Sequence, residues 1–244
     1  MPNAASITSR HGDSLAPKIV YHYRNSPEPS RLQYFFGINV IDKEGDKWWK
    51  GYVGERKTAR QLDTIPNATV LHSITVGSRG RDIDHIVVSP QGVFVINSKL
   101  RSNDVELDGA NITTGKSREF LVKKMEDDAR MVYNLLKDRG IKVFVKPIVS
   151  FTAWGKFASK SAHKNVAMIE YRDIAKHITS LPVDQKMQPA LEQAAAVLSS
   201  PSTWQYHKGG LTDEEREEFD GVLDEIDRAH ERKRRWGIAG VLSV

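Results

Sequence analysis

Two runs of Val and Ile, joined by a Ser-Pro-Gln-Gly turn, stand out from the pattern of hydrophobic and polar positions along the chain. Because β-branched residues dominate both runs, residues 81–89 and 93–99 are predicted to be the strands of a β-hairpin. Successive side chains of a strand point to opposite faces, so Asn97 and Lys99 point the same way. Asp84 of the first strand can meet them at one edge of the sheet, an arrangement that suits a metal ion next to a phosphate.

Hydrophobic periodicity predicts the other elements and the class of fold. Apolar residues spaced for one face of a helix alternate along the chain with short Val- and Ile-rich runs that are typical of strands. The resulting order of helix, strands, helix and strand indicates an α/β fold with a mixed sheet flanked by helices. The predicted helices are 45–62, 121–136, 173–180, 187–198 and 212–236, the further strands are 69–76, 141–151 and 166–170, and a short packed element is expected at 32–40.

Composition divides the chain into three parts. Residues 1–30 are rich in Ser, Pro, Asn and charge and have no apolar period, so we expect a mobile or loosely packed N-terminal arm. Residues 31–182 contain the predicted α/β domain. Residues 183–244 are predicted to form a helical C-terminal extension that packs on the domain as far as about Leu198.

The last predicted helix has a clear start and one apolar stripe. Thr212 and Glu215 form a capping box, and acids precede the basic residues as the helix dipole favours. The stripe either docks on the domain or contacts a second chain, which would produce a homo-oligomer. Its members are Phe219, Val222, Leu223 and Ile226.

The end of the chain is basic and then apolar. The basic run 232–235 precedes the mostly apolar residues 236–244. This is typical of the start of a membrane helix, but about 20 apolar residues are needed to span a bilayer. A membrane partner is therefore expected only if the chain continues beyond Val244, and a hydrophobic tail that packs on the domain is the alternative.

Charge and cysteine content narrow the functional classes. The chain has a net charge of +5 and a pI of about 9.3, which favours polyanionic partners, although a generically basic surface is the alternative. Residues 212–236 carry ten acids and six Lys or Arg, so the excess of positive charge lies in the rest of the chain. The absence of cysteine excludes disulfides, thiolate metal sites and a Cys nucleophile. It also fits a reducing compartment, and the N-terminus lacks the apolar core of a signal peptide, so we expect a cytoplasmic location.

The hairpin resembles the core of a known nuclease family, the nuclease-related (NERD) domain of the PD-(D/E)XK superfamily. The resemblance covers about residues 53–171 and implies a PD-(D/E)XK nuclease-like core with a mixed sheet flanked by helices. It also implies phosphodiester hydrolysis with Mg²⁺, or Mn²⁺, on DNA more than on RNA. The motifs that carry it are Gly54-Glu55, Ile83-Asp84-His85, Pro90-Gln91-Gly92 and Val95-Ile96-Asn97-Ser98-Lys99.

The resemblance implies roles for four residues. Asp84 is the central metal ligand, Glu55 is a further ligand, and Lys99 orients the attacking water or neutralises developing charge. Asn97 stands where the family has the second acid, so it offers a neutral carbonyl oxygen to the metal and should weaken binding. His85 points away from Asp84 and is expected to be a structural hydrogen-bonding residue.

Asn97 leaves three explanations open: an engineered change, a natural loss of catalysis, or a working site in which another acid substitutes. Asp82 and Asp104 are the nearest acids in the sequence. Two rival functions follow from the same position. The domain is then a non-catalytic module that binds nucleic acid, or a membrane-tethered interaction scaffold, because a fold does not fix a function.

Two segments are candidates for contacts with nucleic acid. Arg79 and Arg81 lie in a Gly-rich turn next to the predicted site, where they can contact the phosphate backbone. Trp154, Lys156 and Lys160 form a basic loop with an aromatic residue, which suits phosphate contacts and base stacking. An ordinary hairpin turn and an ordinary solvated loop are the alternatives.

Overall fold

The structure of the protein is a computed structural model, which describes residues 9–38, 40–76, 81–101, 105–108, 111–114, 117–119, 121–153, 157–159, 165–207 and 209–242. The chain divides into two compact units. The first unit comprises Met1–Ser14 and Gly51–Gly210, and the second comprises Leu15–Lys50 and Leu211–Val244. The second unit is therefore built from two segments that lie far apart in the sequence.

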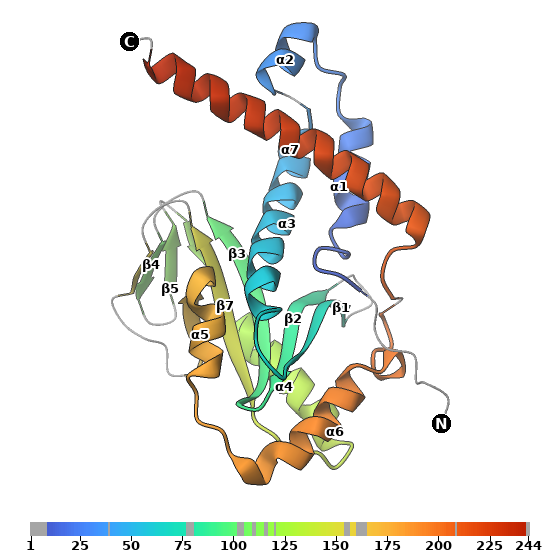
Figure 1. Ribbon diagram of the computed structural model, residues 1–244, viewed down its shortest axis with the longest axis vertical. Helices are drawn as coiled ribbons and strands as arrows, with labels where there is room; N and C mark the ends of the chain where they lie inside the picture. The colour runs from blue at the N-terminus through green and yellow to red at the C-terminus, as the bar shows by residue number, and fades with distance from the viewer. Residues whose placement is uncertain are drawn as a thin grey trace. The chain divides into compact units, whose positions relative to one another are not determined.

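The first unit contains both helices and strands, whereas the second unit is helical (Figure 1). The helices are α1 (Ala16–Asn25), α2 (Arg31–Phe36), α3 (Lys43–Leu62), α4 (Leu121–Lys137), α5 (Ile174–Thr179), α6 (Gln188–Leu198) and α7 (Asp213–Leu242). The strands are β1 (Thr69–Thr75), β2 (Asp82–Ser89), β3 (Gly92–Arg101), β4 (Val105–Asp108), β5 (Asn111–Thr114), β6 (Ser117–Glu119), β7 (Val145–Ala153), β8 (Phe157–Ser159) and β9 (Ala167–Glu170).

A five-stranded mixed sheet with the order β1-β2-β3-β7-β9 is the framework of the first unit. The strands β1, β2 and β3 are antiparallel neighbours, and β7 runs parallel to both β3 and β9. This sheet and its flanking helices confirm the predicted α/β nuclease-like class. A smaller sheet with the order β6-β5-β4-β8 was not predicted, because strands of three or four residues are too short to show a period.

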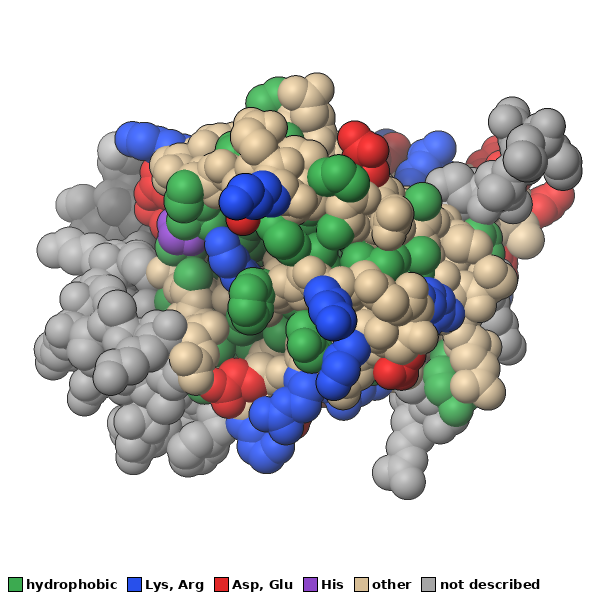
Figure 2. All heavy atoms as spheres, turned by 90° about the horizontal axis from the view of Figure 1, so that it is seen from below, with side chains coloured by type: hydrophobic (Ala, Val, Ile, Leu, Met, Phe, Trp, Pro, Cys, Tyr) green, Lys and Arg blue, Asp and Glu red, His purple; other side chains and the backbone are tan. Residues whose placement is uncertain are grey.

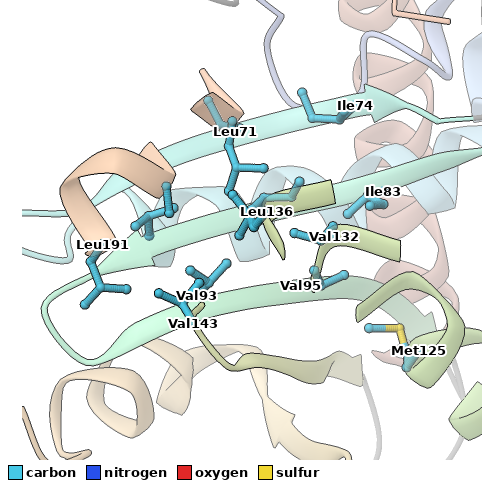
Figure 3. Packing of buried hydrophobic residues seen from close by; sticks show 14 of the residues in the cluster. Leu71, Ile74, Ile83, Val93, Val95, Met125, Val132, Leu136, Val143 and Leu191 are labelled. Atoms are coloured by element: carbon cyan, nitrogen blue, oxygen red, sulfur yellow. The ribbon is translucent and has the colours of Figure 1, made fainter. Parts of the chain in front are cut away.

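Hydrophobic cores cover both faces of the five-stranded sheet. One core joins the sheet to α4 and α6, and it includes Val95, Val132 and Leu191 (Figure 3). The other core joins the sheet to the end of α3 and to α5, and it includes Phe94 and Ile178. The neighbours Phe94 and Val95 of β3 thus face opposite cores, as expected for a central strand that is buried on both sides.

The strand predicted at residues 141–151 begins later, at Val145. The delay has a local cause at the end of α4. Gly140 has a φ of +78°, and the backbone N–H of Ile141 donates to the carbonyl of Leu136 at 3.0 Å. This capping turn uses the backbone of Ile141 to end the helix, so its buried side chain joins the core without strand pairing.

The second unit packs α1, α2 and the first residues of α3 against α7. Its α1 lies within the predicted N-terminal arm, and Ala16 and Ile19 of this helix are buried. Trp49 of α3 donates its Nε1–H to Asp227 of α7 at 2.9 Å. The apolar stripe of α7 is buried within the chain, each of its members being at most 7% exposed: Phe219, Val222, Leu223 and Ile226.

Among the helices in the described part of the chain, none combines the length and the hydropathy needed to cross a membrane.

Candidate metal and nucleic-acid site

The hairpin of β2 and β3 places Asp84 and Asn97 at the point where the pairing of these strands stops. The register runs from the pair of Ser89 and Gly92 to the pair of His85 and Ile96. Asp84 and Asn97 are the next residues on each strand, so their side chains meet beyond the last pair. The structure therefore brings together the acid and the amide that the hairpin pattern had placed at one sheet edge.

Hydrogen bonds from β3 hold the carboxylate of Asp84. The backbone N–H of Ser98 donates to Oδ2 of Asp84 at 2.6 Å, and Nδ2 of Asn97 donates to Oδ1 at 3.1 Å. Both side chains are buried, with 6% of Asp84 and 5% of Asn97 exposed. Oδ1 of Asn97 is also buried and has no hydrogen-bond partner among the described residues. One acceptor of the site is therefore left for a ligand.

Glu55 reaches the same place from α3. The helix comes close to β3 at the preceding residue, where a Cβ on Gly54 would lie 3.3 Å from the backbone nitrogen of Leu100. Glu55 is 5% exposed, and its Oε2 accepts a hydrogen bond from the backbone N–H of Gly12 at 3.0 Å. Gly12 has a φ of +79°, and a Cβ there would lie 2.2 Å from the ring of Tyr52. A segment near the N-terminus thus completes the site, and only glycine fits at its closest point.

Burial of two acids next to each other changes their proton affinities. Burial raises the pKa of Asp84 to about 6, against the opposing effects of Lys99 and of the Ser98 N–H, and the charge of Asp82 adds to the rise. Burial likewise raises the pKa of Glu55 well above its usual value, and the charges of Asp84 and Asp82 raise it further. Lys99 lowers the pKa of both acids, so its ammonium group is within electrostatic reach of each. All four residues to which the family resemblance assigns roles therefore lie together.

Two further cations share a buried acid near this site. Arg81, directly before β2, and Lys124 of α4 both contact the carboxylate of Asp128, which is 1% exposed. Lys124 lies 2.9 Å from Oδ2 of Asp128, and its charge lowers the pKa of Asp84. Arg81 and Lys124 remain 46% and 37% exposed, so both can contact a ligand while Asp128 holds them. Sequence analysis identified Arg81 but missed Lys124 and Asp128.

The opposite face of the hairpin is occupied by histidines. His85 is fully buried, and its Nε2 lies 2.9 Å from Oγ of Ser98. Nδ1 of His85 lies 2.9 Å from Nδ1 of His72, which in turn lies near Asp63. Burial lowers the pKa of His85 well below its usual value, so the ring is neutral near pH 7. These contacts agree with the structural role that the alternation of the strand had predicted for His85.

The donor atoms of the acidic site suit a hard cation. Mg²⁺ and Mn²⁺ prefer oxygen ligands, and the site offers the carboxylates of Glu55 and Asp84 and the unpartnered Oδ1 of Asn97. The residues present therefore fit the ion that the family resemblance implies. Yet no three His, Cys, Asp or Glu side chains within the described ranges are grouped closely enough to hold a metal ion. An acid in place of Asn97 would supply the third such side chain next to Glu55 and Asp84.

Among the described residues, Asp82 is an acid that could take the place of the missing acid at position 97 as a metal ligand. It raises the pKa of both Asp84 and Glu55, and it accepts a hydrogen bond from the hydroxyl of Ser14. Asp104, the other candidate from the sequence, lies outside the described residues.

The predicted nucleic-acid contacts are only partly described. Arg79, Trp154, Lys156 and Lys160 lie outside the described residues, and Arg81 pairs with Asp128 as given above. On the face of the molecule in Figure 2, several Lys and Arg side chains lie next to one another at the lower centre of the view, and others lie singly among hydrophobic and acidic ones.

Comparison with known proteins agrees with the geometry of the site. The family model of the nuclease-related domain matches residues 50–152, a range that contains Glu55, Asp84, Asn97 and Lys99. The predicted resemblance to this family is therefore confirmed over this segment of the chain. An uncharacterized protein of Bacillus anthracis is 37% identical over 67 residues, which cover 25% of this chain and 32% of that protein. The match thus spans about a third of the length of that relative. No solved structure matches the chain.

Proposed function

We propose that the nuclease-related domain is a Mg²⁺-dependent nuclease that hydrolyses phosphodiester bonds of DNA, with an activity that Asn97 restricts. The observation that carries the proposal is the convergence of Glu55, Asp84, Asn97 and Lys99 at one buried edge of the sheet. Buried acids with raised pKa values cost stability, and such groups are concentrated at functional sites. Mn²⁺ is the expected substitute for Mg²⁺.

In this proposal Asp84, Glu55 and Oδ1 of Asn97 hold the ion. The bound ion would lower the pKa of a water molecule and stabilise charge on the phosphoryl oxygens. Asp84 and Glu55 contribute to binding only after each has lost its proton. The ammonium of Lys99 lies within electrostatic reach of both carboxylates, where it can orient the attacking water and neutralise charge.

Arg81 and Lys124 extend the proposal to the nucleic-acid backbone. Both are exposed cations held by Asp128, and Lys124 also lowers the pKa of Asp84. Phosphate contacts of this kind fix the register of a nucleic acid without reading its sequence. We therefore expect cleavage with little sequence preference, on DNA more than on RNA, by a domain located in the cytoplasm.

The direct test is a cleavage assay with plasmid and linear DNA, in Mg²⁺, in Mn²⁺ and in EDTA. We expect slow metal-dependent cleavage by the unmodified chain and an increase of about tenfold or more in Asn97→Asp, because an acid there adds charge to the ligand set. The addition of Asp84→Ala to that variant should abolish the gain. If Asn97→Asp is no faster than an unmodified chain that cleaves DNA, another acid, with Asp82 first, supplies the ligand.

A second candidate function is a non-catalytic module that binds nucleic acid. It is favoured by the hydrogen bond from Nδ2 of Asn97 to Asp84, because this N–H group satisfies the carboxylate oxygen that a metal would otherwise contact. Salt-sensitive binding of DNA without cleavage, in both the unmodified chain and Asn97→Asp, would support this candidate. Neither binding nor cleavage would favour a scaffold, which is the third function that the sequence left open.

A further inference from the structure

The helix α2 of the second unit exposes an unusual amount of apolar surface. None of its six residues, all of which the structure describes, is buried. Leu32 is 71% exposed, Tyr34 51% and Phe35 53%, and Ile38 just beyond the helix is 41% exposed. Single exposed apolar residues are normal on protein surfaces, but a continuous group of this kind marks an interaction site.

The group extends onto α7 through three aromatic rings. The ring of Trp236, which is 43% exposed, lies 5.0 Å from the ring of Phe35 and 5.3 Å from that of Phe36. Gly37 fixes this arrangement, because a Cβ there would lie 2.0 Å from the carbonyl oxygen of Ala229 on α7. The backbones of α2 and α7 are thus in close contact. We call Leu32, Tyr34, Phe35, Phe36, Ile38 and Trp236 the aromatic surface.

Basic residues border the aromatic surface. The guanidinium of Arg232 lies 4.5 Å from the centre of the Tyr34 ring, and the run continues with Lys233, Arg234 and Arg235 directly before Trp236. Of these, Arg235 has an ion pair with Glu231. Lys233 and Arg234 are exposed. The surface therefore combines apolar side chains with an adjacent excess of positive charge.

We propose that the aromatic surface and its basic border bind the surface of a membrane that contains anionic phospholipids. Aromatic and aliphatic side chains insert into the interfacial region of a bilayer, and Lys and Arg at the edge contact acidic headgroups. Trp and Tyr are enriched at this depth because one part of each ring system is apolar and another is polar. The proposal concerns the second unit and does not depend on the proposed nuclease activity.

The chemistry of the surface favours a lipid partner over two others. A second copy of the chain would bring two runs of Arg and Lys toward each other, and like charges across an interface are repulsive. A single-stranded nucleic acid would need free aromatic faces for its bases, yet Phe36 and Trp236 pack edge to face with an interplanar angle of 71°. Leu32, the most exposed member, gives nothing to base stacking but can enter lipid.

The test is co-sedimentation of the full chain with vesicles of phosphatidylcholine alone and of phosphatidylcholine with phosphatidylglycerol. We expect binding to the anionic vesicles and at least about tenfold weaker binding to the neutral ones. Phe35→Ser combined with Leu32→Ser should weaken binding to anionic vesicles about tenfold or more, because both side chains would have entered the lipid. Phe144→Ser is the matched control, since Phe144 is an 82% exposed aromatic residue of the first unit.

A second measurement locates one ring of the aromatic surface directly. Quenching of tryptophan fluorescence by brominated lipid, compared between the unmodified chain and Trp236→Phe, should place the Trp236 ring in the bilayer. The proposal is wrong if vesicles do not bind, if Phe144→Ser weakens binding as much as the double variant, or if lipid does not quench Trp236. It is also wrong if light scattering shows a dimer that the double variant dissociates, or if a single-stranded oligonucleotide competes fully with anionic vesicles.

Discussion

The acidic site of the first unit and the aromatic surface of the second depart from the usual distribution of side chains in opposite directions. The acidic site buries groups that are normally charged, with Asp84 and Glu55 at most 6% exposed. The aromatic surface exposes side chains that are normally buried, such as Leu32 and Phe35. Both arrangements cost free energy in water, but the first requires a precise internal geometry and the second requires only exposure. Substitutions should therefore affect the two regions very differently.

The largest effect is expected for the stability of Asn97→Asp and its response to metal. Without a divalent ion, a further buried acid next to Asp84 and Glu55 should lower the free energy of unfolding by about 1–3 kcal/mol. Saturation with Mg²⁺ should restore the lost free energy of unfolding, since a ligand at about 100 times its Kd stabilises a protein by about 2.7 kcal/mol. Thermal unfolding with and without Mg²⁺ measures both. An unfolding curve of Asn97→Asp that does not respond to Mg²⁺ or Mn²⁺ contradicts the metal site.

The next largest effect tests how tightly the N-terminal segment is fitted to Glu55. Gly12→Ala should lower the free energy of unfolding by about 2 kcal/mol, because a positive φ strains the alanine and its Cβ overlaps the Tyr52 ring. Gly140→Ala is the matched control, with a φ of +78° and no atom within 4 Å of the added Cβ, and it should cost only about 1 kcal/mol. Equal losses in chemical denaturation would mean that the fit around Gly12 contributes nothing.

Two neighbouring lysines of α4 allow a contact with nucleic acid to be compared with an ordinary surface ion pair. Lys124 pairs with the buried Asp128, whereas Lys123 makes an equivalent pair with Asp127 and is 81% exposed. Lys124→Gln should weaken DNA binding about threefold to tenfold and reduce its salt dependence by about one counterion, as the loss of one phosphate contact predicts. Lys123→Gln should change neither quantity. Fluorescence anisotropy at several salt concentrations measures both, and equal effects of the two variants would contradict the proposed contact.

A smaller effect concerns pH. The pKa of Asp84 is about 6 in the folded chain, compared with an ordinary value of 3.8. Protonation of Asp84 therefore favours the folded state, and this contribution to stability is fully present below pH 3.8. This contribution is lost as the pH rises through about 6. Binding of Mg²⁺ needs the deprotonated acid, so its affinity should instead increase over the same range and binding should release protons. Calorimetric titrations at pH 5.5 and 7.5, in buffers of different ionisation enthalpy, measure the affinity and the protons. An affinity that does not change with pH contradicts the assignment of Asp84.

The smallest effect on stability is expected at the aromatic surface. Phe35→Ser removes a side chain that is 53% exposed, so the free energy of unfolding should change by no more than about 0.5 kcal/mol. Ile96→Ser, at a fully buried position of β3, provides the contrast and should cost about 3 kcal/mol or more. Denaturation with urea compares the two. A loss for Phe35→Ser similar to that for Ile96→Ser would show that α2 is held by its apolar side chains.

The sequence predicted those parts of the site that depend on regular alternation along a strand. The convergence of Asp84, Asn97 and Lys99 follows from the period of two and from the tight turn between β2 and β3. The contribution of Glu55 required the family resemblance, because nothing in its local pattern distinguishes it from another helical acid. The order of the larger helices and strands was predicted for the same reason that the hairpin was, since their periods extend over several residues.

Other features of the site have no local signal. Gly12 contacts Glu55 across 43 positions of sequence, and no periodic pattern connects the two. The pair of Lys124 and Asp128 has the same i,i+4 spacing as the pair of Lys123 and Asp127. The two pairs differ only in which face of α4 they occupy, and the sequence alone does not show which face lies toward the site. Likewise, the packing of α1 against α7 joins residues as distant as Tyr23 and Glu225, which hydrogen bond across 202 positions.

The division of the second unit into two distant segments has a consequence for how the protein is made. During synthesis, residues 15–50 leave the ribosome long before residues 211–242, and residues 51–210, most of the first unit, emerge between them. Ile19 and Trp49 of the earlier segment therefore remain exposed to solvent until α7 has been synthesised. A nascent chain stalled before residue 211 can contain a folded first unit, but its second unit cannot yet have assembled. The growing polypeptide is thus exposed to aggregation and proteolysis until α7 has been synthesised.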